Sequence, residues 1–292
     1  MTTKKLSYLL SCFATAFACG AAVAQDTASY SIDVQASLLS DLRSRGISDS
    51  LQEPSTRLTI QAAHEAGFIG LLELSSVSKK QFFDGAGMSI LAAAGYRWGD
   101  PESWHFGVGT ATERFPGARF EAPHAIDVAT FTPTNIRRSS YNSDFLLLEV
   151  GYGALETRVL GVVSQNYRGA NTGSICGQLL LVSADPSRGI ACYDRGDRNS
   201  RGTLLFDVNY RFNLNPQTTL NLHAGHQKVR NFSEADTTDY SIGITHRRWG
   251  FSFTTEWLAV NTRVRDLYLV PDGNRLRATD NNKLVFSISR KF

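Results

Sequence analysis

Seven charged residues stand at positions that alternate with apolar or small residues along the chain. They are Arg57, Glu73, Arg97, Glu149, Asp207, Arg211 and Glu256. Successive side chains of a β-strand point to opposite faces, so these charges would lie on the polar faces of strands. On the wall of a pore they would set the field felt by passing solutes. In a narrow lumen they would instead pair with one another, because an unpaired buried charge costs several kcal/mol.

Residues for catalysis or metal binding are sparse. A serine hydrolase needs a histidine base and an orienting acid close to its serine. His105 and His223 fall on polar faces without such companions, and His64, His226 and His246 fall on the opposite faces. His223 and His226 face opposite ways on a strand and cannot share one metal ion. Phosphate-loop, H-E-x-x-H, C-x-x-C and G-x-S-x-G motifs are absent, so we expect no catalytic residue, metal or cofactor.

Two cysteines beyond the N-terminal segment, Cys176 and Cys192, lie in a region rich in Gly, Ser and Asp. A metal or redox site would want a C-x-x-C pair or neighbouring histidines, which this region lacks. An isolated, nearby pair in an exported protein indicates a disulfide within a loop. We therefore predict a Cys176–Cys192 bond.

Apolar and polar residues alternate with a period of two through about twelve segments, which predicts strands rather than helices. The segments are 30–38, 57–62, 68–74, 88–98, 104–108, 146–152, 157–167, 204–214, 220–224, 240–244, 251–257 and 283–292. The segment 157–167 is the least regular, because its apolar residues occupy both faces. A secreted β-sandwich or a lipocalin-like barrel would also show alternation, so the pattern does not by itself require a membrane.

The connections between these segments alternate between short and long. Every second link is short, whereas 115–142 and 169–201 are long. Aromatic residues also gather near the strand ends beside the short links, as at a membrane interface. These features predict an all-β fold, a transmembrane antiparallel up-and-down β-barrel with short periplasmic turns and long extracellular loops. The segment 115–142, with Arg119, Glu121, Asp127, Arg137 and Arg138, is a candidate for a constriction that folds inward.

The last strand of the chain places large apolar residues on one face and ends on an aromatic ring. Phe286, Ile288 and Phe292 share that face with Leu284, opposite Val285, Ser287, Ser289 and Lys291. Strands that close bacterial outer-membrane barrels resemble this pattern, and they characteristically end in Phe. The resemblance implies that Phe286, Ile288 and Phe292 form an assembly signal for the barrel assembly machinery, and that the outward face meets outer-membrane lipid.

The N-terminus has the pattern of a secretory signal peptide. Lys4 and Lys5 precede an apolar run that ends in small residues at 22–24, so we expect residues 1–24 to be removed and 25–292 to form one barrel domain. Lys4 and Lys5 are the only charged residues of that segment, so 28 of the 30 basic residues then face 27 acidic ones. This balance gives no reason to expect a nucleic-acid partner. The expected location is the outer membrane of a Gram-negative cell.

Several short motifs carry a resemblance to one family. The segment Ser40-Asp41-Leu42-Arg43-Ser44-Arg45-Gly46-Ile47-Ser48 resembles the S-D-Y-x-x-R-G-I-S motif of the TorF-type porin-like proteins of proteobacteria, with Leu42 in place of the usual aromatic residue. Phe115-Pro116-Gly117-Ala118 is similar to the Y-P-G-A turn of that family, and Glu149 matches an acidic residue in its middle strand. The resemblance implies an outer-membrane barrel with pore activity and no defined substrate. The segment with Cys176 and Cys192 departs from the family pattern.

Three hypotheses follow for the function. The first is a porin-like channel for passive diffusion of small polar solutes. The second is a plugged barrel that binds a partner at the cell surface through its extracellular loops. The third, a membrane-embedded hydrolase, has the least support. The sequence does not define the solute, the openness of the lumen or the oligomeric state.

Overall fold

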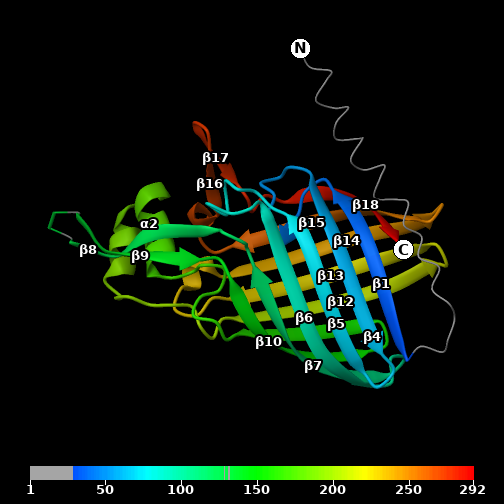
Figure 1. The fold of residues 1–292 in the computed structure, drawn as a ribbon. Helices are drawn as coiled ribbons and strands as arrows, with labels where there is room; N and C mark the ends of the chain where they lie inside the picture. The colour runs from blue at the N-terminus through cyan, green and yellow to red at the C-terminus, as the bar shows by residue number, and fades with distance from the viewer. Residues whose placement is uncertain (1–28, 128, 131) are drawn as a thin grey trace, which may run out of the picture.

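The computed structural model describes residues 29–292 apart from 128 and 131, and it contains a closed barrel of twelve strands (Figure 1). The strands are β1 (Tyr30–Leu39), β4 (Ser55–His64), β5 (Phe68–Ser76), β6 (Met88–Gly99), β7 (Trp104–Arg114), β10 (Ser143–Tyr152), β11 (Leu155–Val162), β12 (Leu204–Asn215), β13 (Thr218–Lys228), β14 (Thr237–Arg248), β15 (Phe251–Thr262) and β18 (Lys283–Lys291). The predicted antiparallel up-and-down barrel and its strand number are confirmed. The predicted signal peptide lies outside the described residues.

Every pairing between neighbouring strands is antiparallel, and β18 closes the barrel against β1. Leu38 pairs with Ile288 across this closure, and the backbone N–H of Phe292 donates to the carbonyl of Val34 at 2.9 Å. Strand β11 runs from Leu155 to Val162, whereas the predicted segment was 157–167. Its pairing with β10 ends at Val162, and the chain beyond it joins the loop end. The proposed assembly residues Phe286, Ile288 and Phe292 are exposed on the outer face, but their role in assembly stays a prediction.

The two ends of the barrel differ. Short links of a few residues connect the strands at one end, which we call the turn end, and both the start of β1 and the C-terminus lie there. The other end, the loop end, carries all the long connections. Its elements are β2 (Arg43–Ser44), β3 (Ile47–Ser48), β8 (Arg119–Asp127), β9 (Thr132–Ser140), α2 (Thr172–Val182), α3 (Ser187–Tyr193), the 3₁₀ helices Ser233–Ala235 and Arg265–Tyr268, β16 (Leu269–Asp272) and β17 (Arg275–Ala278).

The outer face of the barrel is apolar and exposed, and the inner face is polar and covered. Along β10, Leu146 and Leu148 are 56% and 60% exposed, whereas Glu149 between Leu148 and Val150 is 5% exposed. Large aromatic rings, including Tyr96, Trp98 and Trp104, are also exposed near the turn end. None of the helices in the described part of the chain is long and apolar enough to cross a membrane.

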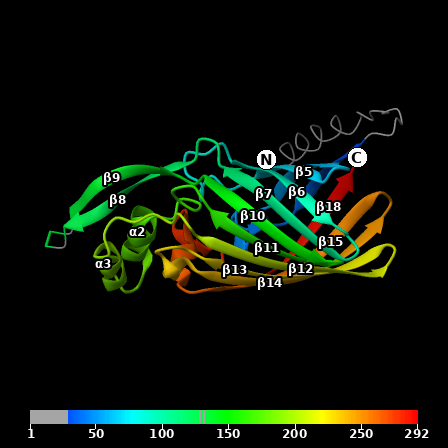
Figure 2. The same ribbon diagram turned by 90° about the horizontal axis from the view of Figure 1, so that it is seen from below.

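The β8–β9 hairpin projects away from the barrel and packs beside α2, as both views show (Figures 1 and 2). The expectation that segment 115–142 forms an inward constriction is therefore wrong. The hairpin is anchored at its base, where the rings of Phe115 and Tyr141 pack against Phe82. This packing holds the two ends of the hairpin outside the lumen. The disulfide between Cys176 and Cys192 joins α2 to α3, with Cα atoms 5.3 Å apart, as predicted.

An apolar core lies at the loop end of the barrel. Phe145 and Leu205 contribute to it from the barrel wall, Tyr167 from the segment after β11, and Ile175 and Leu179 from α2. The Tyr167 hydroxyl donates to Gln227 Oε1 on β13 at 2.8 Å. The connections of the loop end thus pack into the barrel mouth and onto one another.

Candidate functional site

The seven charged residues predicted on polar faces all lie on the inner side of the strands, and five of them form side-chain ion pairs. Arg57 Nε lies 3.2 Å from Glu73 Oε1 across β4 and β5. Arg97 Nη2 lies 2.6 Å from Glu149 Oε1. Arg158, which was not among the seven predicted residues, pairs through Nε with Glu149 Oε2 at 2.8 Å. Arg158 could have been predicted on the inner face from the alternation within β11, but the apolar residues of that segment occupy both faces and obscured the pattern.

A glycine makes the Arg97–Glu149 pair possible. Arg97 on β6 and Glu149 on β10 are separated by β7, whose residue at the crossing point is Gly107. A Cβ atom on Gly107 would lie 3.2 Å from the Glu149 Cβ. The missing side chain therefore lets two arginines from opposite sides converge on one carboxylate, Arg97 as an ion pair and Arg158 through a charge-assisted hydrogen bond, which is stronger than a neutral one.

The remaining predicted charges behave differently from one another. Asp207 pairs with Arg45, and Glu256 accepts a hydrogen bond from the Ser241 hydroxyl. Arg211 is exposed at the turn end, and its guanidinium forms no ion pair with the described residues. Beside Arg97, Glu149 and Arg158 lies a hollow of about 310 Å³ inside the barrel, bordered by small residues of β6 and β7.

Residues 40–54, which we call the inward hairpin, connect β1 to β4 and contain β2 and β3. Asp41 organises the hairpin: its carboxylate accepts from Arg43 Nε at 2.8 Å, from the Ser48 hydroxyl at 2.6 Å and from the Ser50 hydroxyl at 3.0 Å. Its own side chain is fully buried. Residues 40–50 therefore form a compact turn in which three donors satisfy one buried carboxylate, as buried charges require.

The inward hairpin crosses the lumen. Arg45 Nη2 lies 2.7 Å from Asp207 Oδ2 on β12, a strand five places away from β1 in the ring of twelve. At its tip, Gly46 has φ +74°, and a Cβ there would lie 2.7 Å from the Val260 Cβ and 3.0 Å from the Asp239 Cβ. The tip thus touches the barrel wall directly at β14 and β15, and only glycine fits at this point.

Arg168, from the segment after β11, fixes the hairpin from the loop end. Its Nη2 donates to Asp49 Oδ2 of the hairpin at 2.6 Å, and its Nε lies 3.1 Å from Glu113 Oε2 at the end of β7. Its guanidinium also lies 5.2 Å from the ring centroid of Phe115 and 5.6 Å from that of Phe82. One cation therefore neutralises two buried carboxylates while covered by two aromatic rings.

The role of the inward hairpin as a lumen element was not predicted. The Ser40–Ser48 motif indicates by itself only a family resemblance, and the segment named as a candidate constriction was 115–142. The composition of residues 40–54 could have indicated this role. A short loop that combines Asp41, Gly46 and two arginines can satisfy its polar groups internally and can therefore be buried.

His223 acquires an acidic neighbour that sequence alone did not reveal. Its Nε2 lies 2.9 Å from Asp239 Oδ2, and its Nδ1 lies 2.9 Å from Asn209 Oδ1. Ser241 stands opposite His223 in the register, but its hydroxyl donates to Glu256. Both ring nitrogens of His223 are thus occupied, which leaves none to accept a proton from a serine nucleophile.

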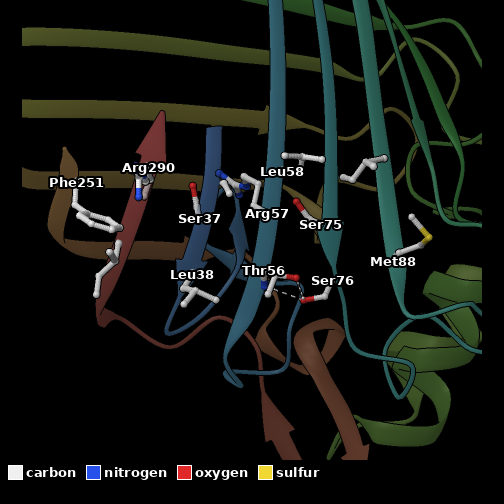
Figure 3. Close-up of a pocket in the computed structure, with 14 residues that line it drawn as sticks. Ser37, Leu38, Thr56, Arg57, Leu58, Ser75, Ser76, Met88, Phe251 and Arg290 are labelled. Atoms are coloured by element: carbon white, nitrogen blue, oxygen red, sulfur yellow. Dashed lines mark hydrogen bonds between the residues drawn. The ribbon is translucent and has the colours of Figure 1, made fainter. Parts of the chain in front are cut away.

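A second hollow, of about 510 Å³, lies on the outer side of the wall over β1, β4, β5 and β18 (Figure 3). Leu38, Leu58 and Met88 line it, and Thr56 is hydrogen-bonded to Ser76 at its edge. Leu38 and Leu58 belong to the outward-facing set, so the hollow is part of the apolar exterior and not of the lumen.

Comparisons with solved structures return porins of low identity. The KdgM porin in complex with disordered oligogalacturonate is 10% identical, with a TM-score of 0.45 over 89% of this chain and 98% of that chain. The NanC porin is 10% identical, with a TM-score of 0.48 over 90% and 99%. A mutant of the Rh. blastica porin is 11% identical, with a TM-score of 0.32 over 82% and 55%. At these values the likeness says nothing about what this chain binds.

No curated protein matches the chain. A family model described as a bacterial protein of unknown function, Gcw_chp, matches residues 23–292. The more specific resemblance to the TorF-type proteins stays a prediction. Because the match covers nearly the whole sequence, the chain belongs to this bacterial Gcw_chp family.

Proposed function

We propose that the chain is an outer-membrane channel for passive diffusion of small polar solutes. The observation that carries the proposal is the contrast between the two faces of the closed barrel. Exposed Leu146 and Leu148 face outward beside an inner wall that holds Glu149 and its two arginines. An apolar belt suits lipid contact, and a charged interior suits water and polar solutes. The loop end would then face the cell exterior, and the turn end the periplasm.

In this proposal the inward hairpin is a gate. Two of the contacts that hold it are polar: Arg45 with Asp207 on the wall, and Arg43 with the Asn281 carbonyl of the β17–β18 connection at 2.6 Å. Water can replace hydrogen bonds of this kind at small net cost, typically about 1 kcal/mol each. Release also uncovers Leu42 and Leu51, which are 4% and 2% exposed in the docked hairpin, so the docked state is the more populated one. The channel conducts only during the fraction of time that the hairpin is away.

The wall charges should set ion selectivity. We expect Glu149→Gln to raise the permeability ratio of anions to cations about tenfold, because a unit negative charge about 6 Å from a passing ion in water attracts a cation and repels an anion by roughly 0.7 kcal/mol each. The variant leaves Arg97 and Arg158 without their shared carboxylate. The measurement is the reversal potential of single channels in a planar bilayer under a salt gradient.

Glu65→Gln is the matched control, because Glu65 is exposed in the turn between β4 and β5, outside the lumen. Heat-modifiable gel mobility reports that each variant is folded. A shift of the reversal potential in Glu65→Gln as large as that in Glu149→Gln would contradict the role of Glu149 in selectivity. Folded protein that never conducts would contradict the proposed channel.

The gate should respond to pH through Asp49. Burial raises the pKa of the Asp49 carboxyl, and the charge of Arg168 offsets this only in part, with Asp41 and Arg57 also close by. A docked hairpin therefore binds this proton more tightly than a released one, so docking is strongest at low pH and weakens as pH rises through the raised pKa. We expect the open fraction to increase by up to about tenfold per pH unit from about pH 4 up to the raised pKa, and to stay level above it.

Single-channel recordings at stepped pH measure this directly. Asp49→Asn should flatten the pH dependence, because the residue can no longer exchange a proton. An open fraction that falls with rising pH, or an unchanged dependence in Asp49→Asn, would exclude Asp49 as the titrating group.

A plugged barrel that binds through its loops is the second candidate. The specific observation in its favour is the burial of Asp49, Leu51 and Ser48 in the inward hairpin. The two candidates differ in one respect. A binding protein stays electrically silent even when the hairpin has been released from the lumen, whereas a gated channel conducts.

A further inference from the structure

A polar hollow of about 590 Å³ lies at the loop end, separate from the charged lumen. The base of β9 forms one side, the ends of β7 and β10 form another, and residues 164–166 and 197–199 close the rest. Small-molecule sites typically have volumes of about 300–1,000 Å³. The hollow is therefore large enough for a compact ligand.

Positive charge dominates this hollow. Arg114 Nη2 pairs with Asp144 Oδ1 at 2.5 Å, and Arg137 Nη1 pairs with Asp197 Oδ2 at 2.7 Å. The other two arginines of the lining are less compensated. Arg138 Nε lies 3.9 Å from Glu121 Oε1, and Arg198 Nε donates to the Arg195 carbonyl at 2.8 Å, with no carboxylate partner in the described part of the chain.

The rest of the lining is neutral and polar, with amides of Asn142, Gln165, Asn166 and Asn199 and hydroxyls of Ser139 and Ser140. No apolar side chain lines the hollow within the residues described. Planar guanidinium groups match carboxylates in geometry, and amides and hydroxyls match the hydroxyls of a sugar. An apolar ligand would find no complementary surface here.

Side-chain bonds hold the two halves of the hollow together. His124 Nδ1 of β8 lies 2.6 Å from Asp197 Oδ1, and Asn171 Nδ2 at the start of α2 donates to the Ser139 hydroxyl at 2.9 Å. The disulfide-tied helices and the β8–β9 hairpin are thus fixed relative to each other. A site arranged in advance loses less entropy on binding.

We propose that this hollow binds a sugar acid, either a monosaccharide or the end of a short acidic oligosaccharide. Arg138 and Arg198 take the carboxylate, and the surrounding amides take the hydroxyls. The site lies at the loop end and shares no lining residue with the hollow beside Arg97, Glu149 and Arg158, so its test does not depend on the proposed channel.

The test is calorimetric titration of the folded, detergent-solubilised protein with D-glucuronate, D-glucose and inorganic phosphate. We expect D-glucuronate to bind, D-glucose to bind at least tenfold more weakly, and phosphate to compete poorly because it lacks the hydroxyls. Arg138→Gln and Arg198→Gln should each weaken D-glucuronate binding about tenfold, the effect of losing one charge-assisted contact.

Arg188→Gln is the matched control, because Arg188 is exposed on α3 away from the hollow. Arg138 is a half-exposed side chain, so its replacement leaves the barrel intact, as gel mobility will show. Absence of D-glucuronate binding, equal binding of D-glucose or phosphate, or an equal loss in Arg188→Gln would each overturn the proposal.

Discussion

Gly46→Ala should open the channel about ten- to a hundredfold more often than the wild-type chain. The new methyl group would stand 2.7 Å from the Val260 Cβ and 3.0 Å from the Asp239 Cβ. Both atoms are attached directly to barrel strands and cannot move aside as a flexible side-chain end would. Overpacking of this kind costs about 1–3 kcal/mol, and about 1.4 kcal/mol corresponds to a tenfold change in an equilibrium. The docked hairpin bears that cost, and the released hairpin does not.

The matched control for this prediction is Gly202→Ala. Gly202 has φ +86°, comparable to the φ of +74° at Gly46, but a Cβ added at Gly202 would have no heavy atom within 4 Å. Both variants therefore carry the same backbone strain, and only one carries the steric overlap. Single-channel recordings give the open fraction. An open fraction in Gly46→Ala no higher than in Gly202→Ala would show that the tip of the hairpin does not gate the lumen.

Arg168→Met should release the inward hairpin more completely. The substitution leaves Asp49 and Glu113 buried without the cation that both contact, at 2.6 and 3.1 Å in the wild-type protein. Breaking a buried ion pair by removing one partner costs about 3–5 kcal/mol. We expect the released fraction to rise at least a hundredfold, measured as tryptic cleavage after Arg43 and Arg45, which are covered while the hairpin is docked.

Two further variants separate this effect from a general loosening of the loops. Arg201→Met removes an arginine from the same connection, where its Nε donates only to the Val163 carbonyl, and should leave cleavage unchanged. The double variant Arg168→Met, Asp49→Asn should recover part of the docking, because it removes one of the two stranded charges. Equal cleavage in Arg201→Met, or no recovery in the double variant, would contradict the role of Arg168.

The alternation of residue types was enough to predict the barrel and its charged inner face. A strand between lipid and water must place apolar and polar side chains on opposite sides. The sequence of each strand therefore indicates which of its faces points into the barrel. The positions of Glu73, Glu149 and Asp207 on the polar face followed from this rule, and so did the separation of short turns from long loops.

The sequence did not predict which charged residues of the inner face would form ion pairs with one another. Arg97 and Glu149 lie on strands that are not neighbours, and their pairing depends on the small residue between them, Gly107. Arg158 belongs to the same group, yet nothing local to β11 marks it as a partner of Glu149. Contacts of this kind depend on strand stagger, which every strand of the closed ring determines together.

The sequence by itself thus determined the strands, their inward and outward faces and the Cys176–Cys192 bond, because each depends on local periodicity or on a nearby pair. The closure by β18 was implied by the resemblance of the last strand to those of outer-membrane barrels. Only the tertiary structure decided which loop enters the lumen. The candidate constriction, 115–142, turned outward, while the shorter inward hairpin docked through Arg45 and Arg168. Loops have no periodic pattern to fix their course, and residues distant in the sequence supply the charges that hold them.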